Sequence, residues 1–233
     1  MRRNYRAGAY AEDRFRRGRR SWRRRALPTL AVALVPLCVV YVAISAFFGG
    51  SAWWFVAGLM CGLTVGVGLY AWETAPWDVL KWGIGARGER QTEDVLRDLE
   101  GRGWTVEHDL ERDRGNDDHL VVGPNGVYLL ETKTLHGRIW VEDGVLSNES
   151  PDDPENVYRW DGLAGGLRGR AVSVSRKIEA DTGAAQWVQG VVVVWGDFAQ
   201  RTVEVDRVAY VHGTVLADWL RAQKPARIEL AIA

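Results

Sequence analysis

The most constraining feature of this 233-residue sequence is that positions 27–72 contain no Asp, Glu, Lys or Arg. Within this stretch, Leu27–Phe48 and Ala52–Trp72 are predominantly apolar, and Gly49-Gly50-Ser51 separates them. At about 1.5 Å per helical residue, each segment is long enough to cross a hydrocarbon core of about 30 Å. The sequence therefore predicts a transmembrane helical hairpin with helices over 27–48 and 52–72.

The alternative for the first apolar segment is a secretory signal peptide. Its preceding basic region and its apolar run are both too long for one, and a second apolar segment follows at once. Residues 1–26 hold eleven Arg against two acidic residues, which predicts a cytoplasmic N-terminus. Two spans return the chain to the same side. We therefore expect a multi-pass protein of the plasma membrane, with both termini and the soluble domain in the cytoplasm.

The basic tail, residues 1–26, has two functional interpretations. It is either a topology signal that also contacts anionic lipids, or an arm in which Arg and aromatic side chains contact nucleic acid. Its composition disfavours a folded element. In the second apolar segment, Gly58, Gly62 and Gly66 form a small-residue face that permits close helix packing. We expect this face to pack on the first span of the same chain, although it also permits a homodimer.

The rest of the chain reads as a juxtamembrane linker, residues 73–85, and a soluble domain, residues 86–233. Together they hold 19 basic and 28 acidic residues, so this part is acidic. The two cysteines, Cys38 and Cys61, both lie in the apolar segments. A disulfide scaffold and a thiol-dependent enzyme are therefore excluded for the soluble domain.

Apolar periodicity and turn residues predict the elements of the soluble domain. The expected helices are 86–100, 170–180 and 214–223. The expected strands are 104–106, 118–122, 127–133, 138–141, 145–146, 190–195, 203–205 and 208–211, with loops over 112–117 and 147–169. This order, a helix, several strands, a helix and a strand, indicates an α/β domain.

The residues with the clearest chemical signal lie on the predicted strand 127–133. Side chains alternate along a strand, so Glu131 and Lys133 share one face. If Pro124-Asn125 is a two-residue loop, Asp118 on the preceding strand lies directly opposite Glu131. A bulge at Gly126 would instead shift this register by one.

Two directly opposed carboxylates repel each other, and a divalent cation between Asp118 and Glu131 would remove that penalty. Without a cation, removing either carboxylate is expected to stabilise the domain. The alternative for Glu131 and Lys133 is a solvent-facing salt bridge at a strand end. His119 is either a group that supports Asp118 or a surface residue.

Glu89 adds a further carboxylate to these residues. It precedes Leu96 by seven positions, close to two helical turns, which places it on the core-facing side of its helix. A carboxylate there needs a partner. The alternative is that Glu89 lies in the first turn of the helix, where the helix dipole favours it.

These residues resemble the nuclease-related domain, or NERD domain. The motifs that carry the resemblance are Gly85-Ala86-Arg87-Gly88-Glu89, Asp118-His119, Gly123-Pro124-Asn125-Gly126-Val127, Glu131-Thr132-Lys133 and Gly137. The resemblance covers about residues 82–220 and is strongest over 85–140. The family often has Asn-Pro followed by Gln before its later helix. Here the corresponding segment, Glu155–Trp160, offers no such Gln.

The resemblance implies membership of the PD-(D/E)xK superfamily, with a restriction-endonuclease-like αβββαβ core after the transmembrane helical hairpin. It implies that Asp118 and Glu131 are metal ligands, that Lys133 is the catalytic lysine and that Glu89 is the helix carboxylate of the catalytic site. The all-oxygen ligand set suits Mg²⁺, and Mn²⁺ could substitute.

The function that follows is a membrane-anchored, metal-dependent nuclease acting on phosphodiester bonds of DNA or RNA. The first alternative is a non-catalytic module that binds nucleic acid or protein at the cytoplasmic membrane face. The acidic charge of the soluble part favours this alternative, because nucleic-acid contact normally requires a basic surface. A second alternative is a membrane assembly factor with a vestigial domain. A basic groove near Asp118 and Lys133 would favour the nuclease.

Overall fold

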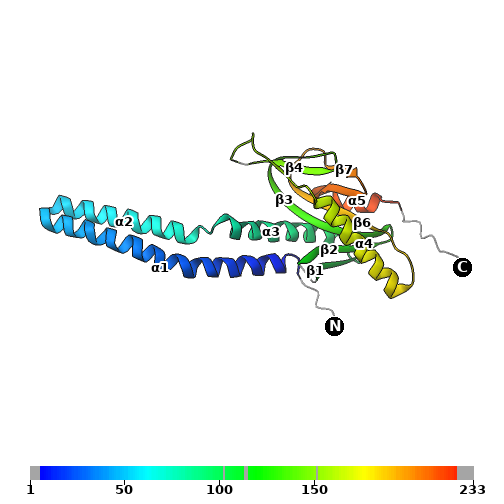
Figure 1. The fold of residues 1–233 in the computed structure, drawn as a ribbon, viewed down its shortest axis with the longest axis horizontal. Coiled ribbons are helices and arrows are strands. Elements are labelled where there is room, and N and C mark those ends of the chain that lie inside the picture. Colours follow the sequence, from blue (N-terminus) through cyan, green and yellow to red (C-terminus); the bar gives the residue numbers. More distant parts are fainter. Residues whose placement is uncertain (1–5, 102, 113–114, 151, 225–233) are drawn as a thin grey trace. The chain divides into compact units, whose positions relative to one another are not determined.

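The computed structural model describes residues 6–101, 103–112, 115–150 and 152–224 (Figure 1). Residues 1–5 of the predicted tail, 113–114 and 151 in the predicted loops, and 225–233 at the end of the predicted domain lie outside the described residues. Contacts divide the chain into two units. One comprises residues 12–83, and the other comprises residues 84 onward together with the segment that ends at Ala11.

Residues 12–83 are dominated by two antiparallel helices, α1 (Ala9–Phe48) and α2 (Ser51–Glu73). The chain reverses at Gly49 and Gly50, whose φ angles of 65° and 87° favour glycine. At the opposite end of the pair, arginines 19 and 23 both form ion pairs with Glu73, at 2.7 and 2.6 Å. Both helices are long and apolar enough to cross a membrane.

The prediction that the basic tail lacks a folded element is wrong. Helix α1 begins at Ala9 and continues without a break into the first apolar segment. Arginine is a good helix former, and the tail also contains two ion pairs between residues four apart, Glu12 with Arg16 and Asp13 with Arg17. Such pairs add stability to a helix that the apolar segment already propagates.

The predicted packing of the glycine face of α2 on the first span is also wrong. No atom lies within 4 Å of the positions that a Cβ would take on Gly58, Gly62 and Gly66. Helix α2 instead buries Thr64 and Gly68, and a Cβ on Gly68 would collide with a leucine of α1. The glycine face is thus uncovered by α1, and the homodimer through it stays a prediction.

Helix α3 (Trp77–Arg97) replaces much of the predicted linker. It begins just after Pro76, nine residues earlier than expected, because the proline ends the preceding segment and its carbonyl accepts the first helical N–H groups. The helix also ends at Arg97 rather than at residue 100. Residues 73–85 are therefore largely helical.

The unit that continues from residue 84 is built, within the described residues, on one eight-stranded mixed sheet. Its strands are β1 (Thr105–Glu111), β2 (Asn116–Gly123), β3 (Gly126–Glu142), β4 (Val145–Glu149), β5 (Val157–Arg159), β6 (Val188–Phe198), β7 (Thr202–Val205) and β8 (Val208–His212). The order is β1-β2-β3-β6-β8-β7, with β4 paired to β3 and β5 paired to β4. The β3–β6 and β6–β8 pairs are parallel, and the other pairs are antiparallel.

Helices cover both faces of this sheet. Helix α4 (Leu163–Thr182) packs Leu167 and Ala171 on one face. The other face is covered by Leu96 near the end of α3, Leu99 just after it, a short 3₁₀ turn over Gly213–Val215, and α5 (Leu216–Ala222). Strand β6 is buried on both faces, as its four consecutive valines predict. With β4 and β5 inserted between β3 and α4, the order α3, β1, β2, β3, α4, β6 is the αβββαβ arrangement expected of the core, so the predicted α/β fold class is confirmed.

Several predicted boundaries change within this fold. The strands expected over 127–133 and 138–141 are one long strand, β3, with a register shift between Thr134 and Arg138. Gly137 in this bend has φ 71°, and a Cβ there would lie 2.5 Å from the Glu149 carbonyl oxygen. The predicted loop 112–117 includes the start of β2. The predicted loop 147–169 includes the end of β4, all of β5 and the start of α4, because local sequence does not reveal short edge strands.

Candidate active site

The β2–β3 hairpin has the register that the two-residue loop predicts. Gly123 pairs with Gly126, and the ladder continues to the pair of His119 with Leu130. Beyond this pair the Asp118 carboxylate accepts the backbone N–H of Thr132 at 2.7 Å. Asp118 therefore lies at the next position of the ladder, opposite Glu131, where the two strands stop pairing.

Glu131 lies between two cations. Its Oε1 accepts a hydrogen bond from Lys133 Nζ at 2.5 Å, and its Oε2 accepts one from Arg170 Nη2 on α4 at 2.6 Å. Burial raises the pKa of Glu131, but the charges and hydrogen bonds of Lys133 and Arg170 outweigh it, so the pKa falls below its ordinary value. Glu131 is therefore an ionised carboxylate in a network that reaches a second strand, because Arg170 Nε also lies 3.4 Å from Asp117 Oδ1.

Asp118 has the opposite electrostatic situation. Its side chain is buried, and burial together with the negative charges of Glu131 and Glu89 raises its pKa well above the usual value. The Thr132 N–H and the Lys133 charge act in the other direction but are weaker. Asp118 is thus a carboxyl group whose charge the surrounding residues do not compensate.

Glu89 is buried in α3 and interacts electrostatically with the same residues. Burial, followed by the charges of Asp109 and Glu131, raises the pKa of Glu89 to about 7, against opposing effects from the Gly8 backbone N–H and Lys133. Its Oε2 is a buried atom with no hydrogen-bond partner among the described residues. Because α3 begins at Trp77, Glu89 lies well inside the helix, and the alternative that places it in the first turn is wrong.

The structure thus brings together the four residues that the sequence singled out, Glu89, Asp118, Glu131 and Lys133. It adds Arg170, which sequence reasoning missed because the side chain comes from a helix 39 residues further along the chain. The contact to the Gly8 backbone was also missed. It comes from the residue just before α1, 81 residues before Glu89, and Tyr10 N in the first turn of α1 donates to Asp109 Oδ2 at 2.8 Å.

His119 takes neither of its predicted roles. It is fully buried, and strand alternation directs it away from the face of Asp118. Its Nδ1 lies 2.8 Å from Nδ1 of His108 on β1. Burial, with a smaller contribution from His108, lowers the pKa of His119 to about 3. His119 is therefore a neutral core residue.

The cluster suits a hard cation by its chemistry. Its donors are carboxylate oxygens, and the unpartnered Oε2 of Glu89 and the uncompensated Asp118 would both gain from a nearby positive charge. Within residues 6–224, masked positions aside, no group of three or more His, Cys, Asp or Glu residues is placed to hold a metal ion. The fit is thus to a cation bound by two carboxylates, with water or phosphate as its other ligands, which is the usual arrangement for Mg²⁺.

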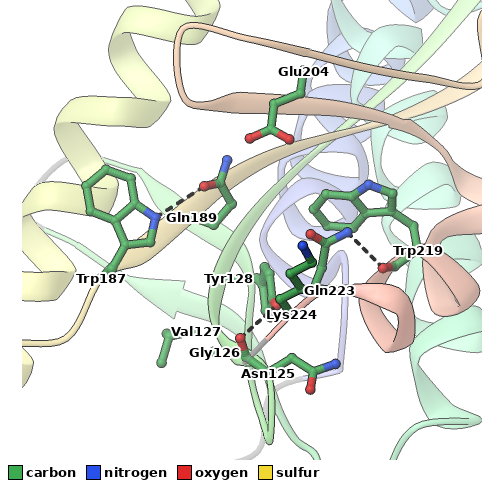
Figure 2. Close-up of a pocket in the computed structure, with 10 residues that line it drawn as sticks. All are labelled: Asn125, Gly126, Val127, Tyr128, Trp187, Gln189, Glu204, Trp219, Gln223 and Lys224. Carbon is green, nitrogen blue, oxygen red and sulfur yellow. Dashed lines mark hydrogen bonds between the residues drawn. The ribbon is translucent and has the colours of Figure 1, made fainter. Parts of the chain in front are cut away.

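A small cavity of about 150 Å³ lies at the other end of the same strands (Figure 2). Tyr128, Trp187 and Trp219 line it, together with polar side chains that include Gln189. Along β3, Tyr128 is five residues before Lys133, about 16 Å at the rise of an extended strand. This cavity is therefore separate from the carboxylate cluster.

A first prediction follows from the pKa of Glu89. In the folded state this pKa is raised from 4.5 to about 7. The contribution of Glu89 to stability is therefore complete below pH 4.5 and is lost as the pH rises through about 7. Over this interval we expect the free energy of unfolding of the metal-free wild type to fall by up to about 3 kcal/mol relative to that of the variant Glu89→Gln, which cannot ionise. The measurement is the melting temperature of both proteins from pH 4.5 to pH 8.

The control is Glu93→Gln, which removes a carboxylate one helical turn later on α3 that faces Arg97. It should not reproduce the pH dependence of the Glu89 variant. Parallel melting curves for the wild type and Glu89→Gln across the whole range would contradict the burial and charge environment described for Glu89.

The comparisons with known proteins agree with this geometry. The model of the nuclease-related domain family matches residues 84–195, which include most of α3, β1–β5, α4 and most of β6. No curated protein and no solved structure matches the chain. The predicted resemblance to this family is therefore confirmed over residues 84–195.

Proposed function

We propose, from the match of residues 84–195 to the nuclease-related domain family, that this chain is a membrane-anchored nuclease that hydrolyses phosphodiester bonds of DNA or RNA with Mg²⁺. The observation that supports the proposal most directly is the arrangement of Asp118, Glu131 and Lys133 on one hairpin. An uncompensated carboxyl group and an ionised one lie next to a partly exposed ammonium group. This combination provides cation ligands and a positive charge for a phosphate within one site.

Each residue has a distinct role in this proposal. Asp118 and Glu131 hold the cation, which when bound polarises the phosphoryl group and lowers the pKa of a water molecule; Mn²⁺ could take its place. Lys133 orients the attacking water and offsets the charge that develops on the phosphate. Arg170 holds Glu131 from the opposite side. Glu89, with a pKa of about 7, can accept or release a proton near neutral pH.

The membrane location is supported by the surface of α1 and α2. Large apolar side chains along both helices, among them Val32, Phe47, Phe55 and Leu69, are more than half exposed. Soluble monomers rarely expose so large a continuous apolar surface. We propose that both helices cross the plasma membrane, with the arginine-rich start of α1 contacting anionic lipids on the cytoplasmic side.

A second prediction tests this topology. Eleven Arg before the first apolar segment and two successive spans support an orientation with both termini in the cytoplasm. A reporter that functions only in the cytoplasm should therefore be active when it is fused at residue 1 and when it is fused at residue 233. As a control, a reporter inserted at Gly50, between the two helices, should be active only on the other side of the membrane. A C-terminal fusion that is active outside the cytoplasm would rule out the proposed orientation.

A binding module without catalysis is the competing function, and one observation favours it. Both oxygens of Glu131 already accept hydrogen bonds from cations of the chain itself. In such a module these ion pairs would be permanent, and the acidic domain would bind a protein or nucleic acid through another surface. In a nuclease, a divalent cation would compete with Lys133 and Arg170 for Glu131.

The deciding experiment is a cleavage assay with the full-length protein in detergent, on single-stranded and double-stranded DNA and RNA, with and without Mg²⁺. The full chain is needed because Gly8, just before α1, contacts Glu89, and Tyr10, in the first turn of α1, contacts Asp109. Mg²⁺-dependent cleavage supports the nuclease. The absence of cleavage, together with a melting temperature that does not respond to Mg²⁺, supports the binding module.

A further inference from the structure

Strand β5 and the residue after it, Trp160, form an exposed aromatic edge next to the candidate site. This is the segment whose sequence departs from the family pattern. Strand β5 pairs only with β4 among the described strands, so it is an edge of the sheet. Val157, Tyr158 and Trp160 are 42%, 52% and 37% exposed. Exposed aromatic residues on a strand edge promote unwanted association, so their presence here calls for a functional explanation.

Trp160 is held rigidly despite its exposure. Its backbone N–H donates to the Leu146 carbonyl oxygen at 2.9 Å, and its indole Nε1 donates to Asn148 Oδ1 at 3.0 Å. The Asn148 side chain is buried, and its Nδ2 donates to the carbonyl oxygens of His136 and Glu149. One amide thus joins the indole to two strands, and the ring is ordered before any ligand arrives.

The ring of Trp160 lies beside the candidate catalytic lysine. Lys133 Nζ is 5.7 Å from the ring centroid, while the same atom donates to Glu131 at 2.5 Å. The ammonium group therefore has a carboxylate as one neighbour and an aromatic ring as another. A phosphate that contacts Lys133 would carry its own nucleotide base into the vicinity of this ring.

We propose that Trp160 stacks on an unpaired base of the substrate, so that the site takes single-stranded nucleic acid or a frayed end in preference to an intact duplex. This inference rests on the proposed nuclease function. Bases inside a duplex have both faces covered by their neighbours, whereas an unpaired base presents a free face. Stacking on aromatic side chains is a common and sequence-tolerant way to bind such bases.

The chain offers a matched control for this role. Trp187 is also partly exposed, at 49%, and its indole Nε1 also donates to a side-chain amide, that of Gln189 (Figure 2). Its neighbour Val188 pairs with Val127 at the start of β3, six residues before Lys133. That is about 20 Å along an extended strand. Trp187 is thus too far from Lys133 to contact the same nucleotide.

The experiment uses the full-length protein in detergent and three DNA substrates of one sequence, a single strand, a blunt duplex and a duplex with an unpaired end. The wild type is compared with Trp160→Leu, which removes the ring, Trp160→Phe, which keeps an aromatic face, and Trp187→Leu. The ratio kcat/KM is measured with Mg²⁺. Stacking is measured separately, without metal, as the fluorescence quenching of 2-aminopurine placed in the single strand.

We expect the wild type to cleave the single strand and the unpaired end faster than the blunt duplex. Trp160→Leu should reduce kcat/KM on the unpaired substrates about tenfold, abolish the preference and lose the quenching. Trp160→Phe should retain most of the preference for unpaired substrates and most of the quenching. Trp187→Leu should behave as the wild type. Retained activity of Trp160→Phe also guards against a folding defect as the cause.

Other outcomes separate this inference from the proposed function. Cleavage that is equal on single strand and duplex, or a preference unchanged in Trp160→Leu, overturns the stacking role and leaves the nuclease intact. An equal loss of kcat on all three substrates also overturns it, because Trp160 would then act only by positioning Lys133. Trp160-dependent quenching without any cleavage supports stacking and refutes hydrolysis. Neither quenching nor cleavage refutes both.

Discussion

Replacing Lys133 with alanine is expected to lower the rate of Mg²⁺-dependent hydrolysis about a hundredfold or more, equivalent to about 3 kcal/mol of transition-state stabilisation. The ammonium group of Lys133 is partly exposed and forms an ion pair with Glu131 alone among the described residues, whereas Arg170 forms ion pairs with both Glu131 and Asp117. An ammonium group cannot ligate a cation. Binding of Mg²⁺, measured as a shift in melting temperature, should therefore persist in the variant.

The fold should also survive this change. Glu131 keeps its ion pair with Arg170 at 2.6 Å when the lysine is removed. The control is Arg138→Ala, which removes an exposed cation from the same strand that faces Glu149 at 3.5 Å. It should cleave as the wild type does. If Lys133→Ala cleaves nucleic acid as fast as the wild type, Lys133 is not catalytic.

The parts of the site that could be predicted from sequence are those fixed by local chemistry. The Gly123–Gly126 turn sets the register of one hairpin, and strand alternation then places Asp118, Glu131 and Lys133 together. Helical periodicity likewise placed Glu89 on the buried side of α3. Each of these inferences spans fewer than twenty residues and depends on a single element or turn.

The parts that could not be predicted depend on contacts between distant segments. Arg170 contacts the cluster from α4, and the Gly8 backbone contacts it from the segment before α1. The sequence around these two residues gives no indication of either contact. Periodicity similarly identified the small-residue face of α2 but could not say which face meets α1, and the contact uses Thr64 and Gly68 instead. Sequence pattern defines faces, whereas tertiary packing selects among them.

The missed Arg170 changes the expected effect of removing each carboxylate. Sequence reasoning predicts that loss of either Asp118 or Glu131 relieves their repulsion and stabilises the metal-free domain. The structure contradicts this prediction for Glu131, because its two cationic partners outweigh the repulsion and lower its pKa. For Asp118 the prediction stands, because burial and the charges of Glu131 and Glu89 raise its pKa.

We therefore expect Glu131→Gln and Asp118→Asn to have opposite effects on the stability of the metal-free protein. Glu131→Gln leaves Lys133 and Arg170 without their shared counter-ion in a largely buried site. The substitution should lower the free energy of unfolding by about 3 kcal/mol and the melting temperature by roughly 10 °C. Asn at position 118 can still accept the Thr132 N–H but carries no charge. This variant should melt at the wild-type temperature or above it.

The pH dependence gives the comparison a second, independent readout. The raised pKa of Asp118 means that its contribution to stability is present at low pH and lost as the pH rises through the folded-state value. The advantage of Asp118→Asn over the wild type should therefore grow with pH. The lowered pKa of Glu131 predicts the reverse, a cost of Glu131→Gln that shrinks as the pH falls through its folded-state value. Melting temperatures of the full-length proteins in chelator, from about pH 2 to pH 8 so that the range extends below the ordinary pKa of Glu131, provide the test. Equal destabilisation by both substitutions at every pH would contradict the opposite electrostatic environments described for Asp118 and Glu131.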